Sequence, residues 1–285
     1  MTVRATMDSA GDASGMQGRE FAWTSADFDR VQDLIYRRAG ISLHDGKHAM
    51  VYSRLSRRLR DTGHQSFKEY LSWLEATEGA EWQEFVNALT TNLTSFFREQ
   101  HHFQIFAELL KSKPASHPWR VWCSAASTGE EPYSIVMTAL DALGNRPHFS
   151  LMASDIDSKV LATAGNGVYK AESLKGISAA QMQAYFMRGK GANAGMVRVK
   201  PELKQLVEFL IVNLIKDDWP FKEPFDVVFC RNVMIYFDAE TQRRVLERIH
   251  RVMKPGGILF VGHAENFSDS RDLFVLKGKT AYERR

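Results

Sequence analysis

The spacing of apolar residues divides the chain into two parts with different periods. From Phe21 to about Lys113, apolar residues recur every three or four positions, which is the spacing of amphipathic helices. Ser25 is a suitable N-cap for the first helix, in which Phe28 and Val31 begin the apolar face. Further helices are predicted over residues 50–60, 67–76 and 81–92. The first part of the chain is therefore expected to be all-helical.

Beyond residue 118, short apolar runs alternate with helical segments. The runs, which are typical of buried strands, cover residues 119–123, 149–154, 207–214, 226–230 and 257–262. The clearest helical segments among them lie at 133–143 and 240–253. Strands that alternate with helices predict a doubly wound, mostly parallel α/β sheet. The segments 257–263 and 276–284 are predicted to form a closing hairpin.

Changes in composition set the expected domain boundaries. Residues 1–20 are small, polar and rich in glycine, serine and aspartate, which predicts a disordered tail. The segment KSKPASHP at 111–118 is typical of a linker. We therefore predict a helical domain over 21–113 and an α/β domain over 114–285. A glycine-rich and then alternating stretch predicts a small antiparallel β insertion near 188–205.

Composition narrows the class of protein without naming its activity. Apolar residues make up 44% of the 285 positions and charged residues 25%, as in globular proteins. No apolar run approaches the roughly 20 residues of a membrane-spanning helix, and no signal pattern opens the chain, so we expect a cytoplasmic protein. Its two cysteines, Cys123 and Cys230, are expected to be free thiols. A net charge of +3 is too small to imply nucleic-acid binding by itself.

Polar residues follow the ends of four predicted strands. The first strand leads into the small-residue turn SAASTGEEPYS at 124–134, and the second ends close to Asp155 and Asp157. The third ends at Asn213–Leu214 and the fourth at Arg231–Asn232. Because parallel strands present their carboxyl ends at one edge, these residues are expected to converge on an adenosine-type ligand. Taken singly, either aspartate could instead cap the following helix, and the asparagine could be a turn residue.

The turn after the first strand separates three classes of cofactor. It lacks the G-x-G-x-x-G pattern that accommodates a pyrophosphate, and no P-loop occurs anywhere in the chain. S-adenosylmethionine has no phosphates, and its amino acid end needs hydrogen-bond donors and acceptors. Gly129, Glu130 and Glu131 beside a helix start suit that end, so S-adenosylmethionine is the predicted cofactor. No metal site is expected.

Three arginines occupy one face of the predicted helix over 50–60. Arg54, Arg57 and Arg58 are spaced at i, i+3 and i+4. Such a face is commonly solvated charge, but it could also dock an acidic partner helix. RNA phosphates would compete for the same face. We expect these arginines to bind a glutamate-rich substrate.

Five stretches resemble the CheR-type glutamate methyltransferases that act on bacterial chemotaxis receptors. They are TTNLTSFFRE (90–99), ASTGEEPYSI (126–135), ASDID (153–157), FCRNVMIYF (229–237) and GHAENFS (262–268). The resemblance covers nearly the whole chain from about Phe21. It implies an all-α N-terminal domain and a Rossmann-like class I methyltransferase domain with a β-subdomain. In some members that subdomain docks a tethering peptide from the C-terminus of a receptor.

The resemblance also implies a set of functional residues. Arg98 and Tyr236 are implied to lie nearest the transferred methyl group. The implied cofactor contacts are Asn92, Thr94, Arg98, Glu131, Asp155, Asn213, Leu214, Arg231 and Asn232. Apart from the family motif, Arg98 would be interpreted as a surface ion-pair partner and Tyr236 as a core aromatic residue.

A glutamate nucleophile would need little chemical assistance from these residues. Its unperturbed pKa is about 4.3, so the carboxylate is ionised near neutral pH and no general base is required. Arg98 would orient the carboxylate, and the Tyr236 hydroxyl would donate one positioning hydrogen bond. We therefore predict a monomeric, cytoplasmic methyltransferase that modifies glutamates on chemoreceptor helices, contacts the membrane only through receptors and binds no nucleic acid. The alternatives are a non-catalytic S-adenosylmethionine sensor that binds receptors, and an RNA or small-molecule methyltransferase.

Overall fold

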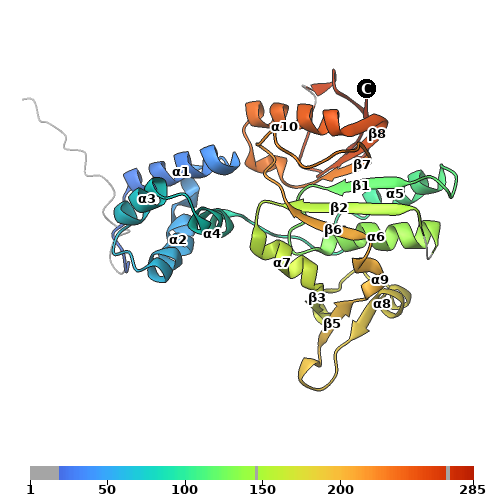
Figure 1. Cartoon of the computed structure of the whole chain (residues 1–285), viewed down its shortest axis with the longest axis horizontal. Coiled ribbons are helices and arrows are strands. Elements are labelled where there is room, and N and C mark those ends of the chain that lie inside the picture. Colours follow the sequence, from blue (N-terminus) through green and yellow to red (C-terminus); the bar gives the residue numbers. More distant parts are fainter. Residues whose placement is uncertain (1–18, 145–146, 268–269) are drawn as a thin grey trace, which may run out of the picture.

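The N-terminal unit is a compact group of helices. The structure, a computed structural model, describes residues 19–144, 147–267 and 270–285, so most of the expected tail over 1–20 lies outside the described residues. The helical elements are α1 (Ser25–Ala39), η1 (Asp45–Lys47), α2 (His48–Thr62), α3 (Phe67–Ala76) and α4 (Ala80–Leu89). Their apolar faces form one core that includes Phe28, Val51, Tyr70 and Phe85. This confirms an all-helical first part (Figure 1).

The start of α1 and the end of α4 differ from the predictions. The N-cap of α1 is Thr24, whose hydroxyl accepts a hydrogen bond from the backbone N–H of Asp27, and not Ser25. The Asp27 carboxylate in turn accepts from the Thr24 backbone, which completes a capping box. Helix α4 ends at Leu89, three residues before the expected end, because Thr90 adopts an extended conformation. The chain therefore leaves the helical unit at residue 90.

The larger unit is built on one seven-stranded sheet. Its strands are β1 (Trp119–Cys123), β2 (Phe149–Asp155), β6 (Val207–Ile211), β7 (Phe225–Cys230), β8 (Met253–Val261), β9 (Phe274–Gly278) and β10 (Ala281–Arg284). The order across the sheet is β6-β2-β1-β7-β8-β10-β9, and the first five strands of that order are parallel. The predicted doubly wound, mostly parallel sheet is confirmed. The order reverses between β1 and β7, where such sheets bind their ligands.

Helices cover both faces of this sheet. They are α5 (His101–Lys111), α6 (Glu130–Leu143), α7 (Ser158–Asn166) and α10 (Ala239–Val252). Within β1 the side chains alternate: Val121 and Cys123 pack in a core with residues of α5 and α6, whereas Trp122 packs in a core with residues of α10. Burial on both faces explains why the strands are continuous apolar runs in the sequence.

Helix α5 belongs to the sheet and not to the helical unit. Phe103, Phe106 and Leu110 are buried in the same core as β1 and α6. The core of the helical unit therefore ends near residue 90, where the cores of the sheet begin, whereas the sequence placed the boundary at 113. Composition was misleading here, because the proline-containing segment at 111–118 is only the connection from α5 to β1.

A small antiparallel sheet is inserted into the crossover from β2 to β6. Its strands are β3 (Val168–Lys170), β4 (Phe186–Arg188) and β5 (Met196–Val199), in the order β3-β5-β4. The helical pieces around them are η2 (Ala171–Ser173), α8 (Ala179–Tyr185), η3 (Gly191–Asn193) and α9 (Pro201–Lys204). The sheet thus begins about twenty residues before the segment expected near 188–205, because β3 directly follows α7.

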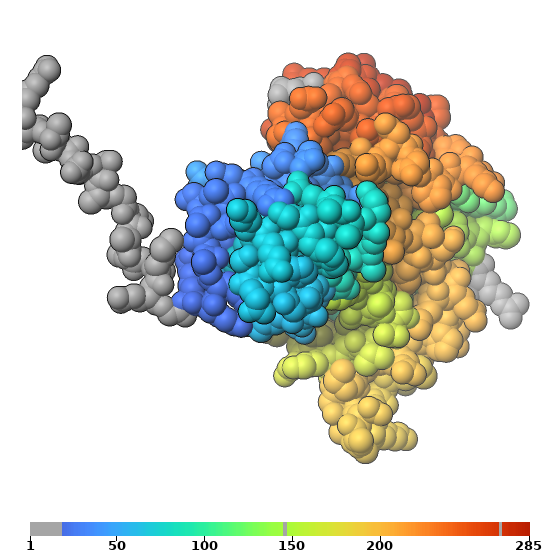
Figure 2. Space-filling model, turned by 60° about the vertical axis from the view of Figure 1, so that its left-hand side comes forward, coloured from blue at the N-terminus to red at the C-terminus, as the bar shows by residue number. Residues whose placement is uncertain are grey.

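The last strands form a different hairpin from the one predicted. Strands β9 and β10 pair antiparallel across a tight turn, and β10 also pairs antiparallel with β8. The two predicted segments therefore lie side by side in the sheet, but the hairpin is formed by β9 and β10 and begins two residues before the second segment. Figure 2, seen from the side of the helical unit, shows that unit seated against the larger one. None of the helices formed by the described residues is both long and apolar enough to cross a membrane.

Candidate active site

A cavity of about 320 Å³ lies beyond the carboxyl ends of the parallel strands. This is within the size range of small-molecule sites. One wall comes from the strand ends and the other from the helical unit. The structure brings ten of the predicted site residues together around it: Asn92, Thr94, Arg98, Glu131, Asp155, Asn213, Leu214, Arg231, Asn232 and Tyr236.

The turn after β1 brings backbone close to the cavity. Gly129 is the N-cap of α6 and has φ of +100°, a conformation that disfavours other residues. A Cβ added there would lie 2.6 Å from the hydroxyl of Tyr169, which comes from β3. That hydroxyl donates to the Thr128 carbonyl at 2.8 Å. The small sheet therefore supports the turn from behind.

The two aspartates after β2 have different functions. Asp157 is the N-cap of α7, and its Oδ1 accepts from the backbone N–H groups of Lys159 and Val160. Asp155 lines the cavity instead, and its Oδ2 accepts from the backbone N–H of Ser127 at 2.8 Å. Burial raises the pKa of Asp155 to about 6. Each carboxylate oxygen has further acceptor capacity, so Asp155 can still receive hydrogen bonds from a ligand's hydroxyls.

Arg231 is the centre of a buried charge network. Its side chain is fully buried, and Nη1 lies 2.6 Å from Glu131 Oε2. Nη2 lies 3.4 Å from Glu99 Oε2 and donates to the Arg98 carbonyl at 2.5 Å. Burial opposes ionisation of Glu99, but the charge of Arg231 lowers the pKa of that carboxyl. The Arg231 Nε has no hydrogen-bond partner among the described residues, which leaves one buried donor beside the cavity.

The backbone around the cavity is held in unusual conformations. Phe97, Glu99, Ser127 and Asn232 all have positive φ, between 48° and 58°. Such residues cost free energy and cluster at functional sites. Asn232 is thus a turn residue that also lines the cavity. In the turn over 96–100, Arg98 directs Nη1 to the Leu93 carbonyl at 3.0 Å.

Tyr236 stands where the two units meet. It ends the short helix η4 (Met234–Tyr236), and its carbonyl accepts from the backbone N–H of Ser42 in the helical unit at 2.8 Å. The side chain is half-buried, and no described residue makes a hydrogen bond with its hydroxyl. This differs from a core tyrosine, whose hydroxyl is normally satisfied.

The helical unit contributes a wall that the sequence did not reveal. Residues 41–44, Lys47 and Met50 line the cavity opposite the strand ends. The Asn213 side-chain amide donates to the Arg38 carbonyl at 2.7 Å, which ties the end of β6 to this wall. The spacing of apolar residues could not predict this wall, because that spacing shows only which face of a helix packs against the core of its own domain.

Polar contacts fasten the linker after α4 to the sheet. Oδ2 of Asp157 accepts from the Thr90 hydroxyl at 2.6 Å and from the Asn92 amide at 2.8 Å. The Gln83 side chain donates to the Ile156 carbonyl at 2.7 Å. Asp157, which the sequence offered either as a ligand contact or as a cap, is therefore a cap that does not line the cavity but supports it. It holds the segment that carries Asn92 beside the cavity.

The three arginines of α2 do not line this cavity, and they do not share one environment. Arg58 is mostly buried and pairs with Glu81 on α4 at 2.6 Å. Arg54 donates to the Thr90 carbonyl at 2.6 Å, which fixes the end of α4. Arg57 is exposed, and its side chain has no ion-pair or hydrogen-bond partner among the described residues. Arg54 and Arg58 therefore serve packing between α2 and α4, and Arg57 alone is free for a partner.

This difference predicts opposite outcomes for neighbouring substitutions. Arg58→Ala should lower the free energy of unfolding by about 2 kcal/mol, because Glu81 would lose its buried partner. Arg57→Ala, the matched control one residue away, should change it by less than about 0.5 kcal/mol. Urea denaturation of both variants measures the difference. Equal stability of the two variants would mean that the Arg58 pair is not structural.

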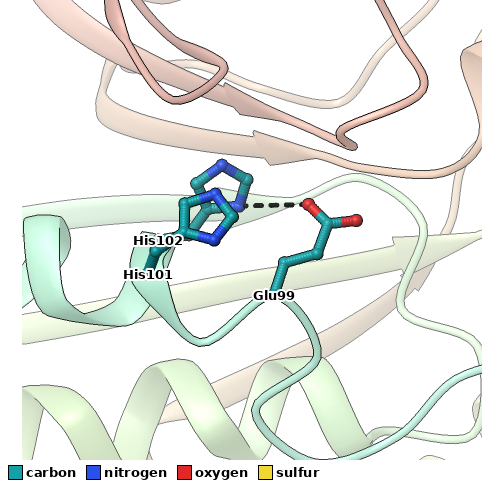
Figure 3. A group of neighbouring side chains, drawn as sticks. All are labelled: Glu99, His101 and His102. Atoms are coloured by element: carbon teal, nitrogen blue, oxygen red, sulfur yellow. Dashed lines mark ion pairs between the residues drawn. The ribbon is translucent and has the colours of Figure 1, made fainter.

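One group of side chains has the composition of a metal site. One potential ligand atom from each of Glu99, His101 and His102 lies within 4.8 Å of the other two (Figure 3). However, His102 Nε2 is already 2.9 Å from both the Lys279 carbonyl and the hydroxyl of Thr280. Burial and the charge of Arg231 lower the pKa of His102 to about 4. A cation here would also face Arg231, so the arrangement favours a structural network that joins α5 to the β9–β10 turn.

Comparison with known proteins agrees with this geometry. Residues 26–90 match the all-alpha domain of CheR methyltransferases, and residues 92–282 match their SAM binding domain. The chain is 53% identical to the chemotaxis protein methyltransferase of Salmonella typhimurium over 93% of this chain and 92% of that one. It is 51% identical to the Escherichia coli protein over 92% and 91%, and 50% identical to chemotaxis protein methyltransferase 2 of Pseudomonas aeruginosa over 93% and 95%. The chain therefore belongs to the CheR family of S-adenosylmethionine-binding methyltransferases.

Proposed function

We propose that this methyltransferase transfers the methyl group of S-adenosylmethionine to glutamate side chains on the cytoplasmic helices of chemoreceptors. The observation that carries the proposal is the junction of the two units. There a cavity suited to an adenosine ligand opens beside Arg98 and Tyr236. The product would be a glutamyl methyl ester. The relatives named above are chemotaxis methyltransferases, which supports chemoreceptors as the substrate class.

The residues around the cavity fit the cofactor. Asp155 would accept hydrogen bonds from the ribose hydroxyls, and Asn213 and Leu214 would adjoin the base. Glu131 and Arg231 form an ion pair that would face the amino acid end. Asn92, Thr94 and Asn232 would complete the contacts. When bound, the cofactor supplies a methyl group activated on a sulfonium centre.

The remaining residues would orient the nucleophile. A glutamate carboxylate is ionised near neutral pH, so the site has to align and desolvate it without removing a proton. Arg98 would attract the carboxylate. The Tyr236 hydroxyl, which bonds none of the described residues, would donate one hydrogen bond to it. The proposed catalytic role of these residues is therefore positioning combined with electrostatic stabilisation.

Further partners follow from the same proposal. Arg57 is an exposed cation of α2 that would meet acidic residues on a receptor helix, and its effect should weaken with salt. The small sheet would dock a receptor's C-terminal tethering peptide in receptors that carry one. The protein would act as a cytoplasmic monomer that reaches membranes only through receptors, without a metal and without nucleic acid.

The affinity for S-adenosylmethionine should fall in acid. With a pKa of about 6, Asp155 is ionised above pH 7 and becomes protonated as the pH drops through 6. A protonated carboxyl accepts hydrogen bonds poorly, so affinity should drop by up to about tenfold per pH unit below 6. Calorimetric titration between pH 5 and 8 measures this. Asp155→Asn is the control: it should bind about 1–3 kcal/mol more weakly and show a flatter profile. A flat profile in the unaltered protein would exclude Asp155 from the ribose contact.

Alkali treatment tests the proposed reaction directly. The protein would be incubated with S-adenosylmethionine that carries a radiolabelled methyl group and with membranes that contain chemoreceptors. Glutamyl methyl esters release volatile methanol in alkali, whereas methylated RNA and methylated amines do not. Labelled methanol from the receptor band is the expected result. A protein that binds the cofactor but labels no receptor would be a sensor, and alkali-stable label in RNA would favour the nucleic-acid alternative.

A further inference from the structure

Two large apolar side chains project from the cavity walls into solvent. Leu93 is 81% exposed and Ile235 is 50% exposed, and both line the cavity. They come from different parts of the chain, since Leu93 lies in the linker after α4 and Ile235 lies in η4. They are also sequence neighbours of the proposed cofactor contacts Asn92 and Thr94 and of Tyr236. The apolar rim, as we call Leu93 and Ile235, thus borders the opening of the proposed active site.

The exposure of Leu93 is imposed by the fold around it. Its carbonyl accepts a hydrogen bond from Arg98, and the neighbouring Asn92 amide is held by Asp157. The backbone is therefore tied on both sides of a side chain that remains in solvent. Exposed apolar residues gathered at one place mark interaction sites, whereas single ones carry no such meaning. Two of them at one opening favour contact with a partner.

The charges beside the rim indicate the chemistry of that partner. Lys47 lines the cavity from the helical unit, and Arg98 lines it from the turn over 96–100. The described residues give Lys47 no carboxylate partner. An opening that carries cations beside exposed apolar side chains complements a carboxylate with apolar neighbours. On a helix, neighbours of a glutamate at i±3 and i±4 lie about 5–6 Å away between Cβ atoms and share its face.

We propose that Leu93 and Ile235 are specificity residues that contact the side chains flanking the target glutamate on its helix. This inference rests on the proposed function, and it names which glutamates the enzyme would select. A glutamate with small or apolar residues at i±3 or i±4 would dock against the rim. A glutamate with charged residues at those positions would be methylated slowly, because those charges would have to lose their water when they pack against the apolar rim.

The test replaces the rim and leaves the catalytic residues in place. Leu93→Ser, Ile235→Ser and the double variant would be compared in receptor methylation and in cofactor binding. The double variant should lose at least tenfold in kcat/KM for receptors, mainly through a higher KM, with S-adenosylmethionine affinity unchanged within twofold. Leu276→Ser is the matched control, because Leu276 is 58% exposed on β9 and does not line the cavity. It should match the unaltered enzyme in every measurement.

Changes on the substrate complete the test. A receptor in which the residues at i±3 and i±4 of one methylated glutamate become lysine should be a poor substrate for the unaltered enzyme. The same change should lower kcat/KM much less in the double variant, because the effects of substitutions at interacting positions are not additive. Unchanged receptor kinetics in the double variant would overturn the inference. So would weakened cofactor binding, which would make the rim a cover for the cofactor. An unaltered enzyme that esterifies no glutamate would instead overturn the proposed function itself.

Discussion

Replacing Arg98 with alanine is expected to lower both cofactor affinity and the rate of methyl transfer. Arg98 lies in the strained turn over 96–100, lines the cavity and keeps its guanidinium next to the Leu93 carbonyl. Loss of a charged donor to a buried ligand costs about 1.5–3 kcal/mol. With the loss of carboxylate orientation, kcat/KM for receptors should fall at least a hundredfold. Calorimetry and initial rates separate the two effects. Arg98→Lys should rescue poorly, because an ammonium group cannot present a planar fork.

Tyr236→Phe provides the contrast for this prediction. The substitution removes only a hydroxyl that bonds no described residue, so fold and cofactor affinity should persist. If the hydroxyl orients the substrate, kcat should drop by about tenfold or more, which corresponds to about 1.4 kcal/mol. Full turnover in Tyr236→Phe would remove the hydroxyl from the mechanism. If Arg98→Ala bound S-adenosylmethionine with normal affinity, Arg98 would contact the substrate and not the cofactor.

Replacing Arg231 with methionine is expected to destabilise the protein by about 3–5 kcal/mol. The substitution would strand Glu131 and Glu99, which both lose their cationic partner in a buried site. Guanidinium denaturation would show the loss as a lower midpoint. Arg243→Met is the matched control, because Arg243 pairs with Asp272 at the surface, where a pair contributes about 0–1 kcal/mol.

A second substitution shows whether the loss comes from the stranded charge. Adding Glu131→Gln to Arg231→Met removes one of the two unpaired carboxylates and should recover part of the stability. If the single variant were as stable as the control, or if the double variant were no better, buried charge would not be the cause.

The sequence predicted the architecture well because strand burial and the order of elements leave their mark on short stretches of the chain. A strand buried on both faces has to be an apolar run, as β1 is, and residues after parallel strands have to meet at one edge. The convergence of Asp155, Asn213 and Asn232 on one cavity follows from that geometry alone. The sequence did not show which of Asp155 and Asp157 contacts the ligand, because the two residues are only two positions apart and both precede a helix. Only the backbone conformation places one in the cap and the other in the cavity.

The parts that sequence reasoning missed depend on contacts between distant residues. Arg58 looked like one member of a basic face, but its partner Glu81 lies 23 residues away on another helix. The wall formed by residues 41–44, Lys47 and Met50 depends on how the helical unit docks against the sheet, and the periodicity of a single helix does not record that. The boundary at 113 failed for the same reason, since α5 is as amphipathic as the helices before it and only its packing partner differs.

The hydrogen bond from Tyr169 to the Thr128 carbonyl has a consequence for protein engineering. A small sheet inserted in a crossover looks like a module that could be deleted to make a minimal enzyme. Deletion of β3 would remove this tyrosine, leave the carbonyl without its donor, and uncover Phe96, whose ring packs edge-on against Tyr169. The exposed turn around η3, at the far end of the same sheet, makes none of these contacts. Grafted peptides or reporter tags should therefore be tolerated there, whereas shortening the insertion should dismantle the cofactor turn.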